Sequence, residues 1–241
     1  MAEFKFPTEV IELPSKGLIY PEDNPLSKGE VEIKYMTAKE EDILTNQNYI
    51  AKGTVLDKLL ESMVVSKIKI KDLIVGDKNA LLVAARVLGY GKNYSFNYKG
   101  KQQNIDLSKI DNKIFDESLY KKGINEFSFT LPNSENNITY KILDGHDEDK
   151  VSNEIEGLKK INPDVSPELS TRLKYMIQSV DGETERKSIR DFVDNYFLAI
   201  DSRAFRDHIK KTQPDVDLSY TLDSGEEVDI PIGIGFFWPD A

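Results

Sequence analysis

Few residues in this sequence could support catalysis or bind a metal ion. The chain has 241 residues, 2 histidines and no cysteine, which excludes thiolate nucleophiles, cysteine metal sites and disulfides. His146 lies in the acidic stretch 144–149, whose order differs from that of a calcium loop. The same stretch is typical of a helix N-terminus, where carboxylates interact favourably with the helix dipole. His208 precedes Ile209, and packing or surface exposure explains this histidine without a ligand.

Motifs that would indicate an enzyme are also missing. The sequence contains no nucleophile elbow, phosphate-binding loop or dinucleotide-binding fingerprint. With 42 acidic residues, the choice of any one carboxylate pair for acid–base catalysis would be arbitrary. We therefore assign no catalytic, cofactor-binding or metal-binding residues and expect a protein that is not an enzyme. A metal-dependent enzyme using His146 and Asp147 is the less favoured alternative.

Charge is distributed unevenly along the chain. The 32 basic and 42 acidic residues give a net charge of −10, which disfavours nucleic acid as a general partner. Residues 214–241 contain seven acidic residues and no lysine or arginine, whereas residues 66–123 contain twelve basic and six acidic residues. These two segments could meet each other or a partner, or they could simply be solvated faces.

The main alternative function is a nucleic-acid-binding module, which would use a basic hairpin expected at residues 92–101. Aromatic residues alternate along its first strand, and lysines flank its turn. They are Tyr94, Phe96 and Tyr98, and Lys92, Lys99 and Lys101. This pattern could provide base stacking and phosphate contacts, but aromatic residues that face a protein core would produce it equally well.

The spacing of apolar residues, prolines and glycines predicts alternating helical and strand-rich regions. Thr37 and Glu40 form a capping-box pattern at the start of the first helix. The expected helices cover residues 55–64, 78–88, 169–180, 189–200 and 202–211, and the expected strands cover residues 10–13, 31–35, 94–98, 105–107, 127–131, 138–142, 218–222 and 228–230. The tail that follows is expected to be extended.

These elements predict an α+β fold with two helical blocks, each followed by antiparallel β-hairpins, and with extended, proline-containing terminal arms. The expected domains are an N-terminal arm (residues 1–36), a helical block with hairpins (37–143), and a second helical block with a C-terminal hairpin and aromatic tail (144–241). No apolar stretch approaches the roughly 20 residues that a membrane-spanning helix needs, so we expect no membrane partner.

Both ends of the chain resemble one protein family. The N-terminal region contains Ile11-Glu-Leu-Pro-Ser-Lys-Gly-Leu-Ile-Tyr-Pro21 and Val31-Glu-Ile-Lys-Tyr-Met-Thr-Ala-Lys-Glu-Glu-Asp-Ile-Leu44. The C-terminal region contains Val228-Asp-Ile-Pro-Ile-Gly-Ile-Gly-Phe-Phe-Trp-Pro239. These segments, with the order of elements between them, resemble the T4-like bacteriophage baseplate hub protein family.

The resemblance implies a role in the assembly or structure of the baseplate hub of a contractile tail, through protein–protein contacts and without catalysis. It leaves open a permanent hub subunit and an assembly factor or chaperone. The implied partners are other baseplate hub or tail proteins, with the tape-measure protein as a further candidate. The implied location is the virion tail baseplate, or the host cytoplasm during assembly.

Some members of this family carry Cys-x-x-Cys pairs at hairpin turns, which suggest zinc. Here the corresponding turns hold Lys99-Gly-Lys101 and Asp223-Ser-Gly225, so we expect neither zinc nor another cofactor.

The aromatic C-terminus is the candidate partner interface. Its residues are Phe236, Phe237, Trp238 and Pro239. Aromatic side chains of this kind often anchor protein interfaces. The alternative is that the terminal segment packs its aromatic residues against the core of its own chain.

Overall fold

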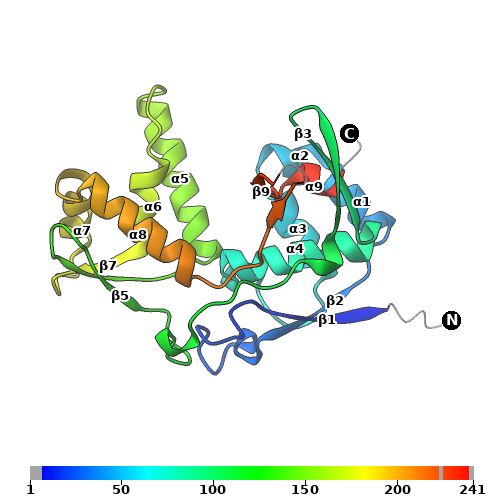
Figure 1. The fold of residues 1–241 in the computed structure, drawn as a ribbon, viewed down its shortest axis with the longest axis horizontal. Helices are drawn as coiled ribbons and strands as arrows, with labels where there is room; N and C mark the ends of the chain where they lie inside the picture. Colours follow the sequence, from blue (N-terminus) through cyan, green and yellow to red (C-terminus); the bar gives the residue numbers. More distant parts are fainter. Residues whose placement is uncertain (1–6, 223–224, 239–241) are drawn as a thin grey trace. The chain divides into compact units, whose positions relative to one another are not determined.

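The computed structural model describes residues 7–222 and 225–238 and has an α+β fold (Figure 1). Helices alternate with strands that form small antiparallel sheets of two or three strands. The predicted α+β class is therefore confirmed. No helix in the described ranges is both long and apolar enough to cross a membrane.

The chain divides into two compact units, each built from segments that are separate in the sequence. Unit 1 contains Met1–Gly17, Glu22–Ile114 and Pro214–Ala241, and unit 2 contains Leu18–Pro21 and Phe115–Gln213. The expected domain boundary between residues 143 and 144 falls inside unit 2. The reason is strand pairing, because strand β6 (Asn137–Tyr140) before that boundary bonds to strand β7 (Ile177–Val180) after it.

Unit 1 combines two-stranded ribbons with a set of helices. Its elements are β1 (Thr8–Glu12), β2 (Glu30–Lys34), α1 (Ala38–Leu44), α2 (Gln47–Ala51), α3 (Val55–Met63), α4 (Val75–Tyr90), β3 (Asn93–Tyr98), β4 (Lys101–Asp106), β8 (Ser219–Thr221), β9 (Glu227–Asp229) and α9 (Ile234–Phe237). The antiparallel pairs are β1 with β2, β3 with β4, and β8 with β9. Helix α4 contacts α3, α9 and both strands of the first ribbon, so it is the central element of this unit.

The N-terminal region contains the two predicted strands, and several of its described residues pack into the protein. Leu13, Val31 and Ile33 of unit 1 are fully buried. Ser15 donates hydrogen bonds from its backbone N–H and its hydroxyl to the buried carboxylate of Asp77 on α4, over 2.9 and 2.6 Å. These described residues of the expected N-terminal arm therefore pack into unit 1.

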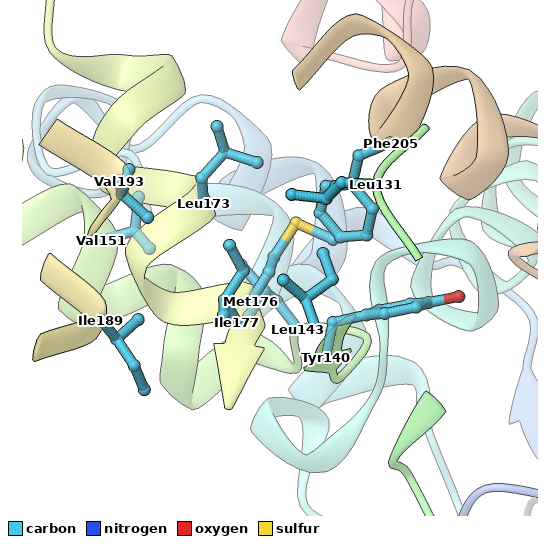
Figure 2. Packing of buried hydrophobic residues seen from close by; sticks show 11 residues of the cluster. Leu131, Tyr140, Leu143, Val151, Leu173, Met176, Ile177, Ile189, Val193 and Phe205 are labelled. Carbon is cyan, nitrogen blue, oxygen red and sulfur yellow. The ribbon is translucent and has the colours of Figure 1, made fainter. Parts of the chain in front are cut away.

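Unit 2 packs four helices against a three-stranded sheet. Its elements are β5 (Phe127–Thr130), β6, α5 (Gly145–Ile161), α6 (Glu168–Met176), β7, α7 (Arg186–Asn195) and α8 (Ala199–Thr212). The sheet is antiparallel with the order β5-β6-β7. Figure 2 shows its core, to which all four helices contribute, including Val151, Leu173, Ile189 and Phe205.

Two expected helices extend too far. The predicted helix 169–180 ends at Met176, and Ile177–Val180 forms strand β7. The predicted helix 189–200 ends at Asn195, and α8 begins at Ala199. In the first case the apolar spacing fits a helix, but β6 supplies hydrogen-bonding partners for residues 177–180, and this pairing makes the segment a strand.

Candidate functional site

The aromatic C-terminus folds back on unit 1. Residues 234–237 form the short helix α9 instead of the expected extended tail. Phe236 and Phe237 are 1% and 0% exposed. The Phe236 ring lies 5.0 Å from the Tyr94 ring, and the Arg86 Nε–H donates a 3.1 Å hydrogen bond to the Phe236 carbonyl oxygen. These two phenylalanines therefore pack against the core of their own chain, which was the alternative to a partner interface. In this conformation they cannot serve as exposed anchors.

The other two predicted interface residues have different positions. Trp238 is half-buried, with its ring 5.7 Å from that of Tyr90. Pro239 lies outside the described residues. A partner role for the C-terminus thus depends on Trp238 within the described part of the chain, and it stays a prediction.

The basic hairpin β3–β4 faces acidic groups of its own unit. Lys92 pairs with Asp106 over 2.9 Å, and Lys99 pairs with Glu226 over 2.8 Å. The hydrogen bond to Glu226 raises the pKa of Lys99. The acidic C-terminal segment therefore meets part of the basic segment. Since Tyr94 is also buried, the core explanation accounts for part of the aromatic alternation.

The acidic stretch 144–149 forms the start of α5. The Asp144 carboxylate accepts a 2.9 Å hydrogen bond from the Asp147 backbone N–H, as an N-cap does. Asp147 is buried and pairs with Lys141 over 2.5 Å and with Lys150 over 3.3 Å. Burial alone raises the pKa of Asp147, but both lysines outweigh it and lower the pKa. The helix-start interpretation is confirmed, and no metal-binding group of three side chains occurs among the described residues.

His208 on α8 is a packing residue, as predicted. Its ring stacks on Phe129 with a centroid distance of 4.5 Å. Its Nε2 shares a 2.9 Å hydrogen bond with the Tyr140 hydroxyl. Burial lowers the pKa of His208, which favours the neutral ring.

The link between α7 and α8 exposes a run of apolar side chains that the sequence analysis placed on a helix. Tyr196 is 63% exposed, Leu198 49% and Ile200 59%. We call residues 196–200 the apolar link. Tyr196 and Ile200 continue the helical spacing of α7, so no signal in the sequence separates these two residues from its buried face.

Ring stacking on one side and hydrogen bonds on the other hold the apolar link. The Phe197 ring stacks on Phe192 with a centroid distance of 5.5 Å. Asp201 at the start of α8 is fully buried and accepts hydrogen bonds from the backbone N–H groups of Asn133 and Ser134, over 2.8 and 3.0 Å. Burial alone raises the pKa of Asp201, but these hydrogen bonds outweigh it and lower the pKa. The exposed side chains are therefore presented from a fixed backbone.

Comparisons with known protein families, with curated proteins and with solved structures each gave no match.

Proposed function

We propose that this chain is a phage tail baseplate hub protein that acts in hub assembly or structure through protein–protein contacts and without catalysis. The assignment to the tail is supported by the resemblance of residues 11–44 and 228–239 to the T4-like baseplate hub protein family. Its partners would be other hub or tail proteins, including the tape-measure protein. It would be located in the virion baseplate, or in the host cytoplasm during assembly.

The apolar link is the observation that carries the contact role. Exposed apolar side chains that gather on one surface mark interaction sites, and tyrosine is a frequent interface anchor. Tyr196, Leu198 and Ile200 are exposed within five residues. Phe197 and Asp201 already hold the backbone of the apolar link. Binding of a partner to these side chains therefore costs little free energy for ordering the backbone.

Purified particles distinguish the two forms of the proposal. A hub subunit should appear at a fixed copy number in peptide mass spectrometry of density-purified particles of the encoding phage. An assembly factor should be abundant in the infected-cell lysate, bound to tail proteins, and missing from particles. The chain's absence both from particles and from complexes with tail proteins would contradict the proposal.

A surface variant tests the apolar link directly. Tyr196→Ser, Leu198→Ser and Ile200→Ser together should leave thermal unfolding nearly unchanged and abolish co-purification with tail proteins, because the side chains are exposed. The matched control is Ile161→Ser with Leu169→Ser, which are 83% and 44% exposed elsewhere in unit 2. This control should co-purify with tail proteins as the wild type does. If the triple variant also co-purifies with tail proteins, the apolar link is not the contact surface.

A further inference from the structure

Strand β5, labelled in Figure 1, is an edge strand of the three-stranded sheet of unit 2. This strand pairs with β6 on one side and is the last strand of its sheet. Within the described ranges, the backbone of Phe127–Thr130 forms no hydrogen bond outside that pairing. An edge of this kind offers unpaired N–H and C=O groups to an added strand.

A pocket of about 470 Å³ lies beside the start of this strand. Its lining comes from β5, β6, the C-terminal part of α8 and residues 119–126. Phe127 is central to its aromatic wall, with ring centroids 4.9 Å from Tyr120 and 5.4 Å from Tyr140. The volume falls in the range of roughly 300–1,000 Å³ that is typical of ligand pockets.

The polar groups of this wall already have partners. The Tyr140 hydroxyl bonds to His208, and the Tyr120 hydroxyl donates to the Thr212 carbonyl oxygen. Burial raises the pKa of both tyrosines and lowers that of His208, so the wall is uncharged at neutral pH. What the wall offers a ligand is therefore chiefly aromatic surface, which suits an apolar or aromatic group.

The rim of the pocket is apolar and carries two opposite charges. Leu119 and Ile124 are 48% and 47% exposed there. Lys121 and Glu126 also line the pocket, and both are exposed. Neither has an ion-pair partner among the residues that the structure describes. A ligand that carries one charge of each sign therefore complements this rim.

We propose that β5 and this pocket bind an extended segment of a partner protein, which adds as a fourth strand and inserts an aromatic side chain into the pocket. An acidic residue of the segment lies toward Lys121 and a basic residue toward Glu126. Residues two apart share one face of a strand, so the segment has the pattern acidic-x-aromatic-x-basic or its reverse.

The open edge selects a peptide over a free small molecule. Strand addition gains affinity from backbone hydrogen bonds and specificity from the pocket, whereas a small molecule in the pocket would leave the edge unpaired. This inference deepens the proposed function, on which it rests for the source of the partner, and it concerns a surface other than the apolar link.

Two synthetic peptides of identical composition test the proposal against the full chain. They are acetylated, amidated and fluorescently labelled versions of Thr-Glu-Val-Phe-Val-Lys-Thr and Thr-Lys-Val-Phe-Val-Glu-Thr. In a fluorescence polarisation titration, one order of charges should bind about fivefold more tightly, as expected of exposed ion pairs. Successive backbone N–H groups of an added strand point alternately toward β5 and away from it. N-methylation of the nitrogens that face β5 should therefore abolish binding, whereas N-methylation of the other alternate set should not.

Variants of the protein locate the binding. Ile124→Glu should weaken binding about tenfold or more by placing a charge in the apolar rim. The control Leu169→Glu, at a residue with 44% exposure that does not line the pocket, should leave affinity unchanged. Exchanging the two charges, with Lys121→Glu and Glu126→Lys together, should reverse the preferred peptide. All of these positions are exposed, so the variants should fold.

Three results would overturn the inference. The first is that neither peptide binds at millimolar concentration. The second is that binding survives both sets of N-methylation or the Ile124→Glu substitution. The third is self-association of the chain, seen by sedimentation, that Ile124→Glu removes, because a second copy would then occupy the edge. The particle analysis and the apolar-link variants test the proposed function separately, so a failure of either can be recognised on its own.

Discussion

Buried carboxylates fix several local structures in this protein. Asp77 accepts hydrogen bonds from Ser15, and Asp201 holds the turn between β5 and β6 through Asn133. The Glu40 carboxylate accepts the predicted capping hydrogen bond from the Thr37 backbone N–H. It also accepts hydrogen bonds from Lys34 and Ser62, which lie outside α1. Glu40 and Asp201 stay ionised because hydrogen-bond donors compensate for their burial and lower the pKa of each carboxyl.

The pKa of Glu40 makes the stability of unit 1 depend on pH. Burial alone raises this pKa, but hydrogen bonds from Ser62, Thr37 and Lys34 outweigh it and lower the pKa from 4.5 to about 2. Ionised Glu40 therefore adds stability above pH 4.5, and this contribution is lost as the pH falls toward 2.

Glu40→Gln should therefore lower the urea midpoint strongly at pH 6 and much less at pH 2.5. The exposed Asp42→Asn on the same helix is the control and should change the midpoint little at either pH. An equal loss at both pH values for Glu40→Gln would mean that the carboxylate charge does not stabilise the fold.

At the scale of elements, the C-terminal segment approaches helix α4 very closely. A Cβ atom added at Gly76, near the start of α4, would lie 2.1 Å from the Pro214 carbonyl oxygen. The neighbouring Asp215 then accepts a 3.1 Å hydrogen bond from the Asn79 side chain of the same helix. Glycine is needed at this position for space, because any side chain would push the backbone of the returning segment away.

Gly76→Ala should destabilise the chain by about 1–3 kcal/mol or more, the usual cost of overpacking. The matched variant Gly157→Ala lies at an exposed position of α5 with no neighbour within 4 Å of the added Cβ. It should stabilise by about 0.5–1 kcal/mol, because alanine loses less conformational entropy in a helix. Chemical denaturation measures both. A neutral Gly76→Ala would contradict the close approach.

At the scale of the whole molecule, the last part of the chain completes a unit that begins at the other end of the sequence. Val216, Leu222, Ile230, Phe236 and Phe237 are all buried in unit 1. Isolated ribbons and short helices of this size need such packing to be stable. The C-terminal segment is therefore structural in addition to any contact that it makes with a partner.

Removal of residues 214–241 should unfold unit 1 and leave unit 2 folded. Hydrogen exchange read by mass spectrometry should show lost protection in α3 and α4 and retained protection in α5 and α8. Glu226→Gln, which removes the exposed ion pair with Lys99 and alters the acceptor of the Tyr98 hydroxyl, should leave the protection of both units unchanged. Retained protection of α4 in the truncated chain would show that the segment is not needed for the fold.

Local signals in the sequence predicted most of the regular elements. Apolar spacing over residues 55–64 predicted α3, and the Thr37 and Glu40 pattern predicted the start of α1. The turn at Lys99 and Gly100 is a tight hairpin turn with φ values of 47° and 78°, and it joins two strands that the alternation had indicated. These features depend on neighbours within a few residues, which is why the sequence was enough.

The candidate site could be predicted only in part. The aromatic C-terminus was recognisable from its composition, but two of its rings are buried, and whether an aromatic residue is exposed depends on what covers it. The apolar link and the pocket beside β5 had no signal, because both continue patterns that normally indicate a core.

The sequence by itself determined the α+β class, the positions of most helices and hairpins, and the uneven charge, because each follows from residue types and their local spacing. Only the tertiary structure decided that Ile177–Val180 is a strand, that residues 214–238 close unit 1, and that β5 keeps an open edge. The physical reason is that burial and strand pairing are made between segments far apart in the sequence, and the same apolar residue can face a core, a neighbouring strand or a partner.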